Sequence, residues 1–204
     1  SYDFHALEVI QCMAERRRGG ETGVSAVQGL QGDAVWKAMD AGVWSSGGWN
    51  PALFEACLSR SQTLAQPATF SHRHPTQQQI REWVKDPLAY RIEYTDGTKA
   101  TMLLMNGLVK DFTFAAKLKG QSEPLSTLFY LPPVPNVAYS AQLMSKAEET
   151  FVTGKSPAPI ERTLLTTGLV EAGVRSVGTG QQHVETPHLS IRYQPPPKSL
   201  FPRN

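Results

Sequence analysis

The sequence predicts an α+β domain in which helices cover one face of an open, mostly antiparallel β-sheet. Apolar residues recur at helical spacing over residues 4–18, which is typical of an amphipathic helix. From Leu88 onward the apolar period changes to two, as in a half-buried strand. Short turns at 95–98 and at Asn106-Gly107 then join successive strands. Such turns require antiparallel pairing, because a parallel return needs a crossover of about a dozen residues.

The predicted helices share an apolar face, with a capping residue at the start or a glycine at the end. Asp33 and Asn50 are expected N-caps. Thr76 with Gln79 forms an expected capping box, and Asn136 is expected to cap the helix that follows three prolines. The expected helices span residues 4–18, 34–41, 51–60, 76–84, 136–151 and 160–177. In the last helix the side chains expected to pack inward are Leu164, Leu165, Leu169, Val170 and Val174.

The predicted strands are short runs rich in β-branched and aromatic residues. They span residues 24–30, 90–94, 101–105, 109–116, 126–131 and 188–193. The segments in the middle are expected to form one open meander. Its apolar side chains are expected to leave one sheet face exposed, through which two copies of the chain associate as a homo-oligomer. These side chains are Tyr90, Tyr94, Met102, Leu104, Phe112 and Phe114.

The length of 204 residues suits one domain, expected over residues 1–193 with a surface loop at 61–75. A proline-rich tail, residues 194–204, follows this domain. The chain begins at Ser1 without an initiating Met and enters a helix at once, which suggests a fragment of a longer protein.

Composition excludes several classes of function. The 20 basic and 18 acidic residues leave a formal net charge of +2, so no binding of nucleic acid is expected. No apolar run reaches the roughly 18–20 residues that span a bilayer, so no membrane association is expected. Cys12 and Cys57 lie outside any Cys-x-x-Cys or zinc pattern and are expected to be buried, reduced thiols. Reduced thiols favour a cytoplasmic location.

Three parts of the chain are similar to parts of one known family. The first is the histidine-bearing opening Asp3–Glu8 with the strand residues Val24–Val27 after it. The second is the meander Tyr90–Ala116, and the third is Phe151–Pro157 with the leucine-rich helix that follows. Together they resemble the C-terminal domain of the glucose-fructose oxidoreductase and inositol dehydrogenase superfamily (Gfo/Idh/MocA), over about three quarters of the chain. Within this superfamily, the sequence most resembles a bacterial branch of oxidoreductase-like proteins. That resemblance implies no particular substrate.

The resemblance implies that His5 is the active-site histidine of a longer parent protein, acting as acid or base beside the carbon that gives up hydride. Here Ser1 and Glu8 stand where the family often has Asp, four residues before and three residues after the histidine. The sequence lacks the dinucleotide fingerprint of the family's other domain, since Gly178-Thr179-Gly180 has no third glycine and follows a helix. We therefore expect no cofactor in this chain, and NAD(P) in the parent on an N-terminal Rossmann domain or chain.

The other candidate substrate-binding residues have both a functional and a structural interpretation. Asp3 and Glu8 can contact a substrate, but acids in a first turn also complement the helix dipole. Trp44 and Trp49, which have glycines nearby, can form a platform for a sugar ring, but tryptophans also cover cores. Without the resemblance, His5 is a helix N-terminal residue bonded to a neighbour.

Two hypotheses of different classes follow. In the first, the chain is the substrate-side and oligomerisation domain of an NAD(P)-dependent oxidoreductase acting on a sugar or cyclitol, and it is inactive on its own. In the second, it is a non-catalytic binding or assembly module that dimerises through its sheet face. A hydrolase is disfavoured because the sequence contains no Gly-x-Ser-x-Gly motif.

Overall fold

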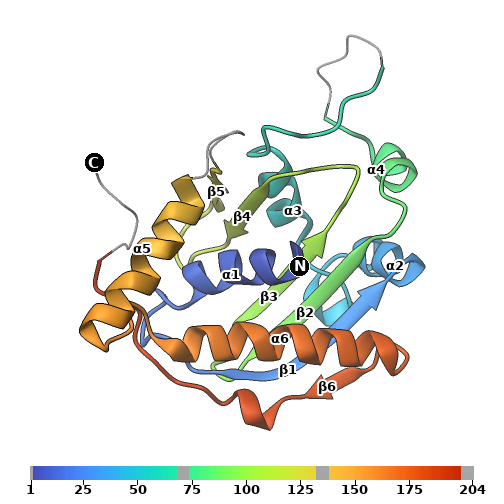
Figure 1. Ribbon diagram of the computed structural model, residues 1–204. Coiled ribbons are helices and arrows are strands. Elements are labelled where there is room, and N and C mark those ends of the chain that lie inside the picture. The colour runs from blue at the N-terminus through green and yellow to red at the C-terminus, as the bar shows by residue number, and fades with distance from the viewer. Residues whose placement is uncertain (1, 69–73, 132–137, 199–204) are drawn as a thin grey trace.

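The computed structural model describes residues 2–68, 74–131 and 138–198 and confirms the predicted α+β class (Figure 1). One antiparallel sheet has the strand order β3-β2-β1-β6, and β4 and β5 form a separate antiparallel hairpin. The strands are β1 (Val24–Gln31), β2 (Leu88–Tyr94), β3 (Lys99–Leu104), β4 (Phe112–Ala116), β5 (Leu125–Phe129) and β6 (His183–Glu185).

The helices flank this sheet, and most begin and end close to the predicted residues. α1 ends at Ala14, before the predicted Arg18, and the Arg17 side chain donates a hydrogen bond to the Ala14 carbonyl (2.7 Å). The predicted cap Asn136 lies outside the described residues. The helices are α1 (Tyr2–Ala14), α2 (Asp33–Ala41), α3 (Pro51–Leu58), α4 (Gln77–Trp83), α5 (Ala138–Thr153) and α6 (Ile160–Gly178), with the 3₁₀ turns η1 (Trp44–Ser46) and η2 (Pro187–Leu189).

Two of the predicted helix caps are confirmed. The Asn50 side chain accepts a hydrogen bond from the backbone amide two residues later (2.9 Å), and Thr76 with Gln79 forms a complete capping box. The prediction for Asp33 is wrong. Gly32 occupies the N-cap of α2, and Asp33 is the first helical residue, where its charge still favours the helix dipole.

The first hydrophobic core lies between the sheet and the pair α1 and α6 (Figure 1). Tyr90, Tyr94 and Met102 point into this core and are 1–2% exposed. The expectation that these side chains form an exposed sheet face is therefore wrong, because α1 and α6 cover them. The other buried members are Leu7, Ile10, Val24, Val27, Ile92, Leu165, Leu169, Ala172, Leu189 and Tyr193.

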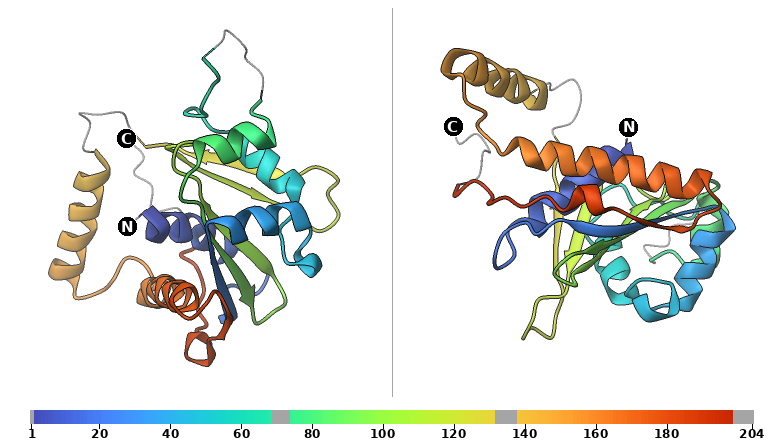
Figure 2. Two further views of the ribbon diagram at one scale, coloured as in Figure 1. Left: turned by 90° about the vertical axis from the view of Figure 1, so that its right-hand side faces the viewer. Right: turned by 90° about the horizontal axis from the view of Figure 1, so that it is seen from below.

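A second core covers part of the opposite sheet face, under α2, α3 and α4, so that α6 and α2 lie on opposite sides of the sheet (Figure 2). Successive residues of a strand point to opposite faces. Ala89 therefore enters this core, and Arg91 and Glu93 point to the same side beyond its edge. The buried members are Leu30, Val35, Ala38, Trp49, Phe54, Leu58, Ile80, Val84, Ala89, Met105 and Leu108.

The predicted single meander is divided between two sheets, because the Asn106-Gly107 turn does not return the chain along β3. Gly107 has a φ of 101°, and a Cβ there would lie 2.3 Å from the carbonyl oxygen of Trp83 at the end of α4. Leu108 then enters the second core, and its carbonyl accepts a hydrogen bond from the Ala65 amide (2.8 Å). The chain therefore runs beside the loop after α3 and leaves the edge of β3. β4 then pairs with β5.

The last strand also lies earlier than predicted. β6 pairs with β1, whereas the predicted strand 188–193 begins inside η2. Pro187 has no N–H to donate to a ladder, and Leu189 enters the first core against Gly168 of α6. Tyr193 forms one isolated bridge, to Glu21.

Glycines allow α6 to lie close to the sheet. A Cβ on Gly173 would lie 2.6 Å from ring atoms of Tyr90, and a Cβ on Gly29 would lie 2.5 Å from the Gly173 carbonyl oxygen. One turn later in α6, the Ser176 hydroxyl accepts a hydrogen bond from the Gly29 amide (2.9 Å). The Tyr90 ring and the hydroxyl thus fix α6 over β1.

α5 stands apart from the rest of the chain in both views of Figure 2. The neighbouring helix α6 is also only partly covered. Leu165 and Leu169 are fully buried, but Leu164 and Val174 are 60% and 57% exposed. The prediction that these two side chains pack inward is therefore wrong.

Replacement of Gly173 tests the close contact between α6 and the sheet. We expect Gly173→Ala to lower the free energy of unfolding by about 1–3 kcal/mol, because the new Cβ would overlap the Tyr90 ring. Gly178→Ala in the same helix is the matched control, since a Cβ there meets nothing within 4 Å, and it should raise stability by up to about 1 kcal/mol. Urea denaturation measures both. Equal effects at the two positions would contradict the contact.

Candidate functional site

His5 lies in the first turn of α1 with its imidazole exposed. Two aromatic rings contact it edge-on, with centroid distances of 5.9 Å to Phe4 and 6.2 Å to Phe112 of β4. Because α1 packs against β4, the β4–β5 hairpin supports the histidine from one side. The ring is therefore positioned by packing and remains accessible.

The neighbouring carboxylate of Asp3 is oriented by a residue of the sheet. Tyr90 is 1% exposed, and burial raises the pKa of Tyr90 to about 12, with the charge of Asp3 and a hydrogen bond to it adding to the shift. The phenol therefore remains protonated at neutral pH and can donate to Asp3. Asp3 and His5 thus share the first turn of α1, where Asp3 contacts Tyr90 of β2 and His5 contacts Phe112 of β4.

A groove of about 510 Å³ includes Phe4, the neighbour of His5, and runs along α6. Within it the Glu171 carboxylate pairs with Arg175 of the next turn (3.5 Å). The remaining lining is mostly apolar, which suits apolar side chains better than the hydroxyls of a sugar. The lining residues are Phe4, Thr167, Val170, Glu171, Val174 and Arg175.

Glu8, the third candidate on α1, joins this helix to α6. The Thr166 hydroxyl donates a hydrogen bond to Glu8 Oε1 (2.6 Å), and Arg162 Nε lies 3.4 Å from Glu8 Oε2. Both partners belong to α6. The Glu8 carboxylate is therefore engaged in helix packing.

Trp44 and Trp49 lie on the other side of the sheet from His5. The Arg91 guanidinium lies 4.1 Å from the centroid of the Trp44 ring, and it donates to the Trp44 carbonyl (2.8 Å) and to Gln28 (2.7 Å). Trp49 is 6% exposed within the second core. The structure therefore brings neither tryptophan to His5, and Arg91 already occupies one face of Trp44.

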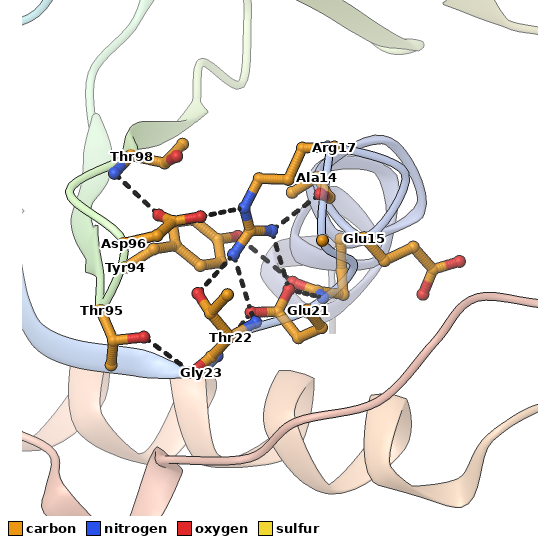
Figure 3. Close-up of polar contacts among 12 residues, drawn as sticks. Ala14, Glu15, Arg17, Glu21, Thr22, Gly23, Tyr94, Thr95, Asp96 and Thr98 are labelled. Atoms are coloured by element: carbon orange, nitrogen blue, oxygen red, sulfur yellow. Dashed lines mark hydrogen bonds and ion pairs between the residues drawn. The ribbon is translucent and has the colours of Figure 1, made fainter.

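A buried polar cluster that we did not predict from the sequence lies where α1 ends (Figure 3). Glu15 and Glu21 are 1% and 2% exposed. Arg17 lies between Glu21 and Asp96, with its guanidinium carbon 4.6 Å from the centroid of the Tyr94 ring.

Each of the five N–H donors of Arg17 has an acceptor. Nε donates to Asp96 (2.6 Å), and the two terminal nitrogens donate to the two oxygens of Glu21 (3.1 Å each). The other two bonds go to the Ala14 carbonyl (2.7 Å) and the Thr22 hydroxyl (2.9 Å). Glu21 also accepts from the backbone amides of the two residues that follow it, at 2.8 Å each.

The cluster continues to the C-terminal segment through Tyr193. Gln11 donates to the Tyr193 hydroxyl (2.8 Å), and that hydroxyl donates to Glu15 (2.8 Å). Burial raises the pKa of Tyr193 well above its ordinary value. One sequence signal was available, since Leu7 and Gln11 share the buried face of α1 and Glu15, the residue after the helix, continues their four-residue spacing. The satisfied bonds indicate a structural role for this cluster.

Two further kinds of feature that bear on function are a cluster of metal ligands and a membrane-spanning helix. Within residues 2–68, 74–131 and 138–198, no three His, Cys, Asp or Glu side chains are grouped so as to hold a metal ion. No helix in this part of the chain is long and apolar enough to cross a membrane. Cys12 and Cys57 are free, partly buried thiols, and burial raises the pKa of Cys57 to about 11.

Comparisons of the chain with protein-family models, with curated proteins and with solved structures find no match. The resemblance of the opening helix, the meander and the closing helices to an oxidoreductase superfamily therefore stays a prediction. The candidate site rests on the placement of His5, Asp3 and Tyr90.

The bond between Arg17 and Asp96 makes stability depend on acid pH. Burial acts to raise the pKa of Asp96, but hydrogen bonds from Arg17 and Thr98 outweigh it and hold that pKa below its ordinary value. The stabilisation is therefore complete above about pH 4 and is lost as pH falls through the folded-state pKa.

We expect Asp96→Asn to lower the free energy of unfolding by about 1 kcal/mol at neutral pH and to reduce the loss of stability in acid. Denaturation between about pH 2 and 7 measures this, with exposed Glu123→Gln as control. A decline in Asp96→Asn as steep as in the wild type would contradict it.

Proposed function

We propose that this chain is the substrate-side domain of an oxidoreductase that removes hydride from a sugar or cyclitol. The observation that supports this best is the exposed imidazole of His5, which packs against Phe112 in the same helical turn that carries Asp3. The resemblance of the opening helix also supports it. A Rossmann domain, on the same polypeptide or a separate one, would hold NAD(P), which accepts the hydride.

His5 and Asp3 have the chemistry that such a reaction needs from a substrate domain. Oxidation of a secondary alcohol removes a hydride from carbon and a proton from oxygen, and an imidazole can take that proton. In the opposite direction it returns the proton to the carbonyl oxygen. Asp3, oriented by Tyr90, can accept a hydrogen bond from a second hydroxyl of a polyol.

Gly178-Thr179-Gly180, the glycine-containing segment most similar to a dinucleotide loop, does not fit the phosphates of the cofactor. Gly178 ends α6 and Thr179 is its C-cap, so the backbone there presents carbonyl groups at the negative end of the helix dipole. Phosphate groups bind at helix N-termini, where free amides point outward. We therefore assign the nicotinamide dinucleotide to the proposed Rossmann domain.

A non-catalytic assembly module is the second candidate. The exposed apolar residues of α5 favour it, with Phe151 86% and Val152 80% exposed. The sheet face offers less apolar surface for association than expected, because Tyr90 and Met102 are buried.

Replacement of His5 in the native protein that carries this domain tests the catalytic proposal. We expect NAD(P)-dependent oxidation of one or more members of a panel of sugars and cyclitols. His5→Ala should lower kcat by about 10²–10⁴-fold, because the general base is lost. His5→Ala should also remove one limb of the pH–rate profile while the cofactor still binds.

His183→Ala is the matched control, since this exposed histidine lies on the edge strand β6 and pairs with Glu93 (3.3 Å). It should leave the rate unchanged, and residues 1–204 alone should be inactive. The proposal would be contradicted if the native protein bound no nicotinamide cofactor, or if the His5→Ala variant kept the wild-type kcat.

A further inference from the structure

α5 carries exposed apolar side chains that have no extensive packing against the other described helices and strands. Its large apolar side chains recur at helical spacing and are mostly exposed: Leu143 66%, Met144 60%, Phe151 86% and Val152 80%. In Figure 2 the helix projects away from the sheet, and it has no extensive packing against any described helix or strand. Isolated helices of this length are marginal in water, so α5 requires a packing partner.

The same side of the molecule offers a surface of matching character. The groove lined by Phe4, Val170 and Val174 is open and largely apolar, and its volume of about 510 Å³ accommodates several side chains of α5. Exposed apolar residues extend it at both ends, including Ile160 (70%), Leu164 (60%) and Tyr2 (64%). We refer to this set as the α6 groove.

We propose that a second copy of this chain covers both surfaces, with α5 of each copy lying in the α6 groove of the other. A two-fold dimer requires that one chain carry both complementary surfaces, and this chain does. The two together hold eight large apolar side chains that are each 57–86% exposed. At roughly 60–120 Å² for each side chain, they supply most of the ~800 Å² per partner of a standard interface.

The charges on the two surfaces also permit self-association. Lys146 pairs with Glu149 within α5 (2.8 Å), and Arg175 pairs with Glu171 within α6 (3.5 Å). The formal net charge of the chain is only +2. Two copies therefore meet without strong like-charge repulsion. The proposal does not depend on the oxidoreductase hypothesis, because it concerns surfaces outside His5 and Asp3.

The mass of residues 1–204 in solution, measured by light scattering over about 1–100 µM, tests the proposal. We expect a dimer. Phe151→Asp in α5 and Val174→Asp in the groove should each raise the dissociation constant by roughly 100-fold or more. Both side chains are exposed in one copy, so the unfolding transition of the monomer should be unchanged. Val43→Asp, at an exposed turn before η1, is the control and should remain dimeric.

Cysteine cross-linking identifies the partner of α5. In a background of Cys12→Ser and Cys57→Ser, a mixture of Phe151→Cys chains and Val174→Cys chains should give a cross-linked heterodimer under mild oxidation. A monomer at every concentration, or a dimer that both charged variants leave intact, overturns the proposal. A chain carrying both cysteines that cross-links within one copy also overturns it, because α5 would then occupy its own groove.

Discussion

The fold depends on the pairing of the buried carboxylate of Glu21 with the Arg17 guanidinium. An isolated carboxylate in this position would be too costly to desolvate, and the arrangement is stable because every donor of Arg17 is used. The acceptors come from the end of α1, from Glu21 and Thr22 just before β1, and from the turn between β2 and β3. Arg17 therefore joins the connection between α1 and β1 to the turn that carries Asp96, 79 residues away in the sequence.

This constraint also determines where the candidate site lies. With the C-terminal end of α1 held at the turn that carries Asp96, the helix extends across the sheet, and its first turn reaches β4. His5 consequently meets Phe112, and Asp3 meets Tyr90, which α6 in turn holds at Gly173. The exposed imidazole is thus supported by an arrangement that begins at the opposite end of its helix.

Features set by neighbouring residues could be predicted from the sequence, and those set by distant contacts could not. The cap of Asn50 and the α+β class depend on local bonding and apolar period, and both are confirmed. The direction of the chain after Asn106-Gly107 depends on α4, which the turn residues do not reveal. For the candidate site, the sequence indicated His5, but not that Tyr90 orients Asp3. Arg17 sits in a basic run that is typical of a solvated surface, and that run does not reveal its bond to the distant Asp96.

The central position of β1 makes the architecture slow to assemble. This strand pairs with β2 on one side and with β6, near the other end of the described chain, on the other. Gln11 likewise bonds Tyr193 across a separation of 182 residues. Such non-local contacts carry a large loop-closure cost, which slows folding. During synthesis on the ribosome, β1 therefore keeps one unpaired edge until the segment after α6 has emerged, and such an edge can pair with another chain.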